Sequence, residues 1–296
     1  MKRALFVLLL AAVGIGVWSM IRKNDKAVMV PQPVSPVITA VEPLPAPVDP
    51  APSLLSEIST LSTQDEKGCL RRIGHLGVNL TGDEVAQAYA FLRLPHSGDA
   101  WEAVQKNNLM NVLREQVLPP PGLAALLAEM VASESLSLTV RDYALQHLVA
   151  FYPRGEDQRI IIDTIRSALG QVQTSMAGTA MLGLRRLDPV DNSITPDEVR
   201  AAARSIALNE RAGELARLTA IRLCGEFGME EVLPEVRSIV LHEKKTLLRV
   251  AAIGALGELG GRKDEALLTP FVDGNQSVLR NAAETALAGL REKNQS

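Results

Sequence analysis

The chain has 296 residues, of which 47% are hydrophobic and only 3% aromatic, and its formal net charge at pH 7 is −3. Residues 54–296 carry 26 basic and 31 acidic side chains without a long basic run, which argues against nucleic acid as the main partner. Many alanines and leucines with few aromatic residues favour stacked helices over a β-sheet. The length suits one helical array or two small domains.

Residues 4–21 form an uncharged, hydrophobic stretch that two basic residues precede and two follow. This is the form of a secretory hydrophobic region, and it is long enough for a short membrane span. We therefore predict that residues 1–27 are a signal anchor or transmembrane segment of the inner membrane, passing once, with the bulk of the chain outside the cytoplasm. The alternative is cleavage after Ser19, which would release the protein into the periplasm.

Residues 28–53 have the composition of a linker. Eight of the seventeen prolines lie between Pro31 and Pro52, among valine, alanine and glutamine. Such a stretch favours the extended polyproline II conformation and acts as a semi-rigid spacer. Proline-rich tracts also serve as ligands, and this alternative stays open beside the spacer function.

Helix signals follow from residue 54 to the end of the chain. Thr63 and Glu66 match a capping box that opens a helix, and Thr81 and Glu84 match a second one. The prolines before Gly122 end a helix abruptly. We expect helices over residues 54–61, 63–76, 81–94, 100–117, 123–134, 138–151, 157–169, 174–187, 199–208, 214–228, 230–242, 247–260, 263–272 and 279–290.

One of these helices sets a pattern for the others. Residues 247–260 (LLRVAAIGALGELG) read aliphatic, Arg, any residue, Ala, Ala and then Ala-Leu. The same order returns 31 residues later at 279–290, 32 residues earlier at 216–228, and 76 residues before that at 140–148. A second amphipathic helix precedes each copy. Self-similarity at 30–40 residues is typical of a helical solenoid, in which each repeat buries its neighbour's face.

Helix pairs with this spacing resemble the HEAT-repeat family in its short bacterial form. The resemblance is clear over residues 137–290 and weaker over residues 63–121. It implies an all-α fold in which residues 54–296 form an α-α superhelix (a HEAT-like solenoid), preceded by the N-terminal hydrophobic helix and the Pro-rich linker. The alternative is an irregular helical bundle around one core.

The sequence departs from the family at one recurring position. The family usually carries an Asp three residues before the aliphatic position, and this Asp bonds the Arg of a neighbouring repeat. The residues that stand at this position here are Ser137, Gly213, Lys245 and Gln276.

The resemblance implies a concave groove lined by the second helix of each pair. We expect this groove to hold a protein or peptide, in a monomer that acts as an exported, membrane-tethered interaction scaffold without catalytic activity of its own. For the arginines among the candidates named in the next sentence, the alternative role is hydrogen bonding between repeats. The partner-binding candidates are Arg141, Gln146, Arg217, Arg222, Arg249 and Arg280.

Motifs for metal or cofactor chemistry are not found. A HEAT-like family of metal-dependent hydroxylases uses repeated His-Glu pairs, whereas this chain has one such pair, His242-Glu243, among four histidines. We therefore expect no metal and no cofactor, and we expect His147 to be a packing residue with satisfied hydrogen bonds. The bilin lyases are a similar group of repeat proteins, so an enzyme or enzyme subunit of the lyase type is an alternative function. An architectural component of the cell envelope is another.

Cys69 and Cys224 lie in helical patterns about four repeats apart. A disulfide requires Cα atoms within about 7 Å, which stacking over this separation forbids. We expect two buried free thiols.

Overall fold

Short helices separated by tight turns make up the described part of the chain. The computed structural model describes residues 53–95, 99–154 and 157–293, and these contain fourteen α-helices and no β-strand. The helices are α2 (Leu54–Gln64), α3 (Glu66–Gly74), α4 (Gly82–Arg93), α5 (Ala100–Arg114), α6 (Leu123–Ala132), α7 (Leu138–Phe151), α8 (Gln158–Leu169), α9 (Ser175–Leu187), α10 (Pro196–Ala207), α11 (Glu214–Glu226), α12 (Leu233–His242), α13 (Thr246–Leu259), α14 (Glu265–Val272) and α15 (Ser277–Lys293).

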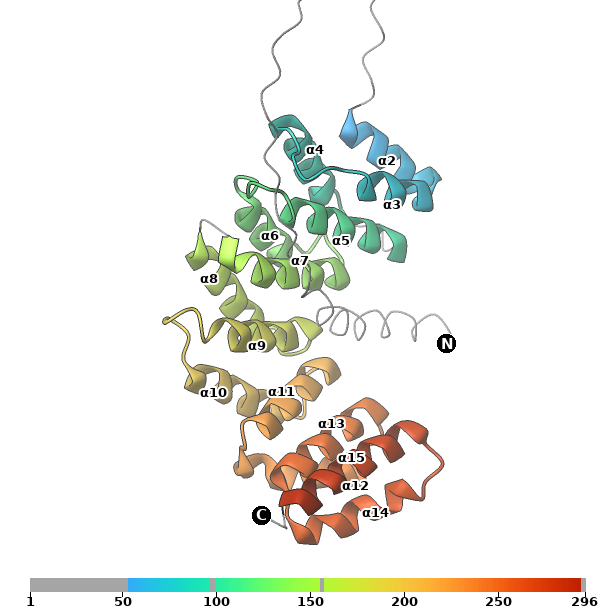
Figure 1. Ribbon diagram of the computed structural model, residues 1–296, viewed down its shortest axis with the longest axis vertical. Coiled ribbons are helices and arrows are strands. Elements are labelled where there is room, and N and C mark those ends of the chain that lie inside the picture. Colours follow the sequence, from blue (N-terminus) through green and yellow to red (C-terminus); the bar gives the residue numbers. More distant parts are fainter. Residues whose placement is uncertain (1–52, 96–98, 155–156, 294–296) are drawn as a thin grey trace, which may run out of the picture. The chain divides into compact units, whose positions relative to one another are not determined.

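These helices pack as consecutive pairs, from α2/α3 to α14/α15. The odd-numbered helices, here called the second helices, form an unbroken row: each of α3, α5, α7, α9, α11 and α13 contacts the next second helix along the chain. The order of packing therefore follows the order of the sequence (Figure 1). This is the arrangement of a solenoid, as predicted, and not that of a bundle around one core.

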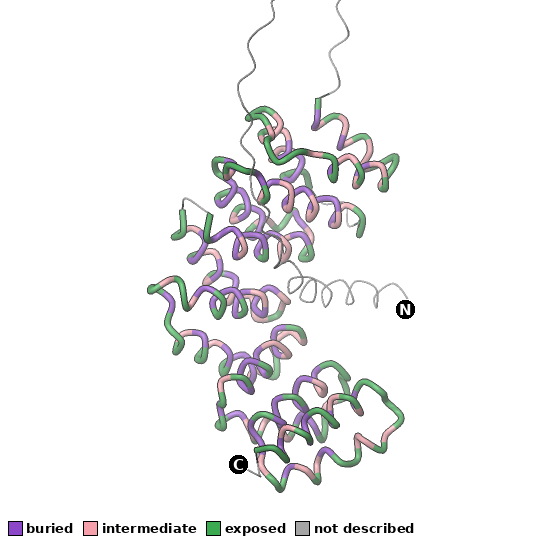
Figure 2. The backbone as a smooth tube through the Cα atoms, in the orientation of Figure 1, coloured by how far each residue is buried: buried purple, intermediate pink, exposed green. Residues whose placement is uncertain are grey.

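Two hydrophobic clusters follow each other along this row. The first runs from α2 to the start of α10 and the second from α9 to α15. Figure 2 shows buried residues on the sides of the helices that meet their neighbours, with exposed residues at the turns and outer surfaces. Small residues bring the second helices close together: a Cβ added to Gly257 of α13 would lie 2.8 Å from the Cα of Ala286 in α15.

The N-terminal caps explain where several helices begin. The predicted capping box of Thr81 and Glu84 is confirmed, because each side chain bonds the other residue's main-chain N–H, over 3.2 and 2.8 Å. The box predicted at Thr63 is wrong. Asp65 caps α3 instead, accepting from the N–H of Gly68 over 2.9 Å. The Thr63 hydroxyl donates back to the main-chain oxygen of Thr60 in α2, so α2 continues past the predicted boundary.

Two predicted helices begin with a separate 3₁₀ turn. Residues Glu230–Val232 form such a turn before α12, and Arg262–Asp264 form one before α14. At the start of α10, Thr195 is the N-cap and Pro196 follows at the first helical position, where its missing N–H costs nothing.

The predicted signal anchor (residues 1–27) and all but the last residue of the predicted linker (28–53) lie outside the described residues. In the part of the chain that the structure describes, no helix is long and apolar enough to cross a membrane. All described residues fall within one unit, which begins at Ala51.

Candidate interaction surface on the second helices

The recurring arginine of the second helices α7 and α11 caps the C-terminal end of the helix before it, the first helix of the same pair. In α7, Arg141 Nε donates to the main-chain oxygen of Val131 near the end of α6, over 2.9 Å. In α11, Arg217 Nε donates to the oxygen of Ala207, the last residue of α10, over 3.0 Å. The last carbonyls of a helix have no partner within the helix, and a cation is favourable at this negative end. The arginine therefore acts as a C-terminal cap supplied by the next helix.

One repeat earlier, a lysine caps the preceding first helix in the same way. Lys106 of α5 is fully buried, and its ammonium donates to the main-chain oxygen of Leu94, the C-cap of α4. It also pairs with Glu102, over 3.2 Å. Sequence comparison missed Lys106, because lysine replaces arginine and glutamine replaces the aliphatic neighbour. The signal that remains is the spacing to the buried Leu109 and Leu113.

The acceptors that replace the family's usual Asp come from the following repeat. Arg141 Nη2 donates to Oε1 of Gln171 over 3.2 Å, and Arg217 is paired with Glu235 of α12. Ser137, at the expected Asp position, instead caps α7 by accepting from the N–H of Val140. The contacts of Arg141 and Arg217 thus agree with the hydrogen-bonding alternative.

Arg249 and Arg280 differ from these two. Arg280 Nη2 donates to the main-chain oxygen of Gly274, over 2.7 Å. The Arg249 guanidinium carbon lies 4.8 Å from the ring centre of Phe271, the only interaction found for this side chain among the described residues. The Nε atoms of both arginines are buried without a hydrogen-bond partner in the described chain.

Gln146 and Arg222, the remaining two candidates, are exposed. They occupy equivalent positions, five residues after Arg141 and Arg217 respectively. Both side chains are accessible to a partner, unlike Arg217, which is 6% exposed.

The structure adds a row of exposed apolar side chains that the sequence pattern did not single out. Leu215, Leu247 and Val278 are 44%, 36% and 53% exposed. Each stands two residues before the recurring arginine, in α11, α13 and α15, and these three helices contact one another in turn. Neighbouring helix axes lie about 8–10 Å apart, so equivalent positions form a row across three repeats. We call these three residues the apolar row.

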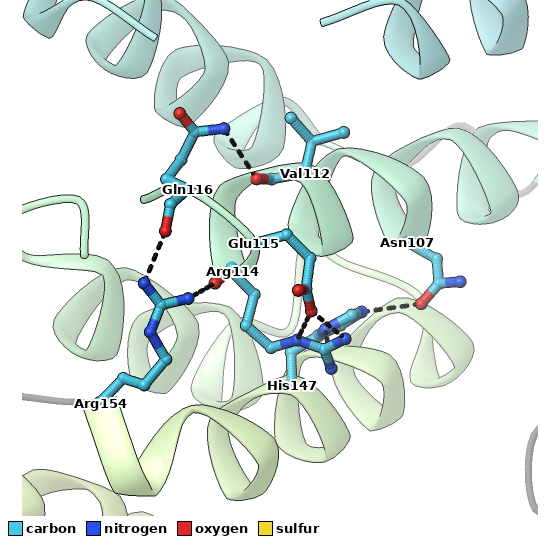
Figure 3. A network of polar contacts seen from close by, with 7 residues as sticks. All are labelled: Asn107, Val112, Arg114, Glu115, Gln116, His147 and Arg154. Carbon is cyan, nitrogen blue, oxygen red and sulfur yellow. Dashed lines mark hydrogen bonds and ion pairs between the residues drawn. The ribbon is translucent and has the colours of Figure 1, made fainter. Parts of the chain in front are cut away.

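His147 lies at the seam between α5 and α7 (Figure 3). It is 5% exposed, with Nε2 2.9 Å from Oδ1 of Asn107 and Nδ1 3.5 Å from Arg114. Burial, and then the charge of Arg114, lower the pKa of His147 to about 3. The ring is therefore neutral at physiological pH, and the prediction of a packing histidine with satisfied hydrogen bonds is confirmed.

A polar brace next to this histidine joins three successive pairs. Arg154 donates to the main-chain oxygens of Arg114 and Gln116, over 2.6 and 2.5 Å (Figure 3). The Gln116 side chain in turn bonds Gly77 and Leu80 in the turn before α4, over 2.9 and 2.8 Å. These bonds satisfy the polar groups of the turns, so this network has a structural role.

Cys69 and Cys224 are free thiols and fully buried, as predicted. Burial raises the pKa of Cys69 to about 11 and that of Cys224 to about 12. Within residues 53–293 apart from the two short gaps, no group of three His, Cys, Asp or Glu side chains could hold a metal ion.

Comparison with known protein families identifies the C-terminal repeats. A family model described as HEAT repeats matches residues 202–288, which cover the end of α10 and most of the chain from α11 to α15. These residues therefore resemble HEAT repeats. No curated protein and no solved structure matches the chain.

The HEAT match contains the whole apolar row and the recurring arginines Arg217, Arg249 and Arg280. The row of second helices continues without a break into α9, α7, α5 and α3, outside the matched residues. The capping cations Lys106 and Arg141 also lie outside the match, so the same packing device extends beyond the residues that the HEAT model matches.

Proposed function

We propose that this HEAT-repeat protein is an interaction scaffold that holds another protein against the exposed surface of its C-terminal second helices. HEAT repeats generally mediate protein–protein interactions, which supports this class of function. The observation that carries the proposal is the apolar row, Leu215, Leu247 and Val278, repeated at one position in three consecutive HEAT repeats. Because these side chains are already about half buried, a partner that covered the rest of one would gain roughly 1 kcal/mol, about half of the value for full burial.

Residues close to the apolar row have the composition expected of a protein interface. Leu218 and Val250 lie next to the recurring arginines, are partly buried and pack against the second hydrophobic cluster. Arg222, on the same helix as Leu215, is exposed and offers a charged group to a partner. An apolar centre with a polar rim is the usual composition of a protein interface.

The location of this scaffold is part of the proposal. Residues 4–21 would anchor the chain in the inner membrane, and the Pro-rich linker, residues 28–53, would hold the repeats several tens of ångström from the bilayer, at about 3.1 Å per residue. Alkaline phosphatase fused after Ser53 tests this arrangement. The fusion is active if the linker is exported and inactive if it stays in the cytoplasm. No catalytic step is part of the proposal.

Site-specific photocrosslinking in the native cell tests the scaffold function. A photoreactive amino acid at Leu247 should give a discrete crosslinked partner, and one at the exposed Ser205 of α10 should not. Changing both Leu215 and Val278 to glutamate should abolish the adduct at position 247. Equal adducts at positions 247 and 205, or an adduct unaffected by the double change, would contradict the proposal.

A further inference from the structure

A small pocket lies beside Arg249, between the start of α13, the end of α14 and the start of α15. Its volume is about 190 Å³. Arg249, Phe271 and the turn residues Asn275 and Gln276 are among the residues that line the pocket. The pocket therefore combines a cation, an aromatic ring and two side-chain amides.

Among the described residues, Arg249 lacks the acidic partner that Arg217, at the same position one repeat earlier, has in Glu235. Arg217 and Arg249 are 32 residues apart, and so are Glu235, the third residue of α12, and Leu267, the third residue of α14. Glu235 pairs with Arg217, whereas Leu267 has no charge to offer Arg249. The acid that compensates the earlier arginine is thus replaced by an apolar residue.

This replacement leaves the Arg249 guanidinium without an anion among the described residues. Its Nε is buried and makes no hydrogen bond there, and its face rests on the Phe271 ring. An unsatisfied buried donor costs about 1–3 kcal/mol, and more when it is charged. Arg280 donates to the main-chain oxygen of Gly274, another residue that lines the pocket, over 2.7 Å. The site is therefore ready to bind an anion, because its cation is already positioned and partly desolvated.

The chemistry of the pocket favours a carboxylate as ligand. The planar guanidinium matches the two oxygens of a carboxylate and binds them through parallel hydrogen bonds. Asn275 and Gln276 are exposed amides that can donate further hydrogen bonds. A single unpaired guanidinium balances one negative charge, which suits a carboxylate better than a doubly charged phosphate group.

We propose that the Arg249 pocket binds a carboxylate of the partner protein, from an acidic side chain or a C-terminus. This inference rests on the proposed scaffold function and names the chemical group that the partner presents. The pocket and the apolar row lie on the same helices, α13 and α15, but side chains two residues apart on a helix point to different sides, so Leu247 and Arg249 offer the partner two separate contacts.

Peptide titrations followed by NMR test this proposal on the full chain. The probes are acetyl-Glu-Leu-amide, with a side-chain carboxylate, acetyl-Leu-Leu with a free C-terminus, and the neutral acetyl-Gln-Leu-amide. At least one carboxylate peptide should shift the side-chain amide signals of Asn275 and Gln276 and saturate, whereas the neutral peptide should bind about tenfold more weakly or not at all. Which carboxylate peptide binds distinguishes the two sources.

Three variants link the binding to Arg249. Arg249→Gln should weaken the carboxylate peptide about tenfold or more. Leu267→Glu restores the acid found at Glu235 and should block the pocket from within, to a similar extent. Leu267→Gln has nearly the same shape without the charge and should bind as the natural chain does. Circular dichroism at the titration temperature verifies that each variant is folded.

The proposal is overturned if the neutral peptide binds as tightly as both carboxylate peptides, or if Arg249→Gln leaves the carboxylate affinity unchanged. These results are separable from those of the scaffold test. A crosslinked partner at Leu247 with no carboxylate binding refutes the pocket and leaves the scaffold standing. Carboxylate binding without any crosslinked partner refutes the scaffold on the apolar row.

Discussion

The guanidinium of Arg217 donates to the main-chain oxygen of Ala207, 3.0 Å away, and thereby ties α11 to the end of α10. Its other end pairs with Glu235 of α12. One side chain thus connects three consecutive helices, and Arg141 makes the corresponding bonds to Val131 and Gln171. At Arg141 and Arg217 the arginine therefore joins neighbouring helices, which accounts for its presence at these two positions better than ligand contact does.

Replacing Arg217 by alanine should destabilise the protein by about 2–3 kcal/mol, because hydrogen bonds to charged groups are worth about 1.5–3 kcal/mol and Ala207 loses its partner in a buried site. The measurement is the free energy of unfolding in urea. Arg222→Ala is the matched control on the same helix. Since Arg222 is exposed, its replacement should change the stability by less than about 0.5 kcal/mol. Equal effects of the two changes would refute the capping role.

Gly257 and Gly254 offer a second matched pair, within α13. A Cβ on Gly257 would lie 2.8 Å from the Cα and 2.9 Å from the Cβ of Ala286, whereas a Cβ on Gly254 meets nothing within 4 Å. Gly257→Ala should force α13 and α15 apart and destabilise by about 1–3 kcal/mol. Gly254→Ala should stabilise by up to about 1 kcal/mol, because alanine favours the helix. Thermal unfolding followed by circular dichroism separates these opposite signs.

The repeat and its helix pairs follow from the sequence, because the spacing of arginine and alanine reports packing between neighbours directly. The helix predicted over residues 138–151 has the bounds found for α7. The cap at Thr63 could not be predicted correctly, since Asp65, two residues later, competes for the same role and wins. Both residues are good N-caps in isolation.

The candidate surface was harder to predict than the fold. In the apolar helix α13, Leu247 and Leu248 are adjacent leucines, yet one is 36% exposed and the other 2%. Their pattern does not separate them, because a helix that is apolar on most of its circumference gives no clear direction for its buried face. In the part of the chain that the structure describes, Arg249 has no acidic partner because Leu267, on a different helix, stands where Glu235 stands one repeat earlier. This difference is found only when corresponding positions of the two repeats are compared in the structure.

The buried thiols should be unreactive in the folded protein. Thiolate is the reactive form, and with a pKa of about 11 for Cys69 and 12 for Cys224 only about one Cys69 in a thousand is ionised at pH 8. Reaction with Ellman's reagent should release fewer than one equivalent from the native protein in an hour and two equivalents in 6 M urea. Rapid reaction of either thiol without urea would show that its helix opens readily.

His147 should make the stability depend on pH between about 6.5 and 3. In the folded protein its pKa is lowered to about 3 from the ordinary 6.5, so only the unfolded chain takes up this proton as the pH falls through that window. Stability is therefore lost on acidification, by about 2 kcal/mol between pH 6.5 and pH 5 for one such group. Urea unfolding at several pH values measures this slope. His147→Gln should remove it, whereas His75→Gln, at an exposed position, should keep it. Parallel slopes for the natural chain and His147→Gln would mean that the folded protein accepts the proton at the seam between α5 and α7.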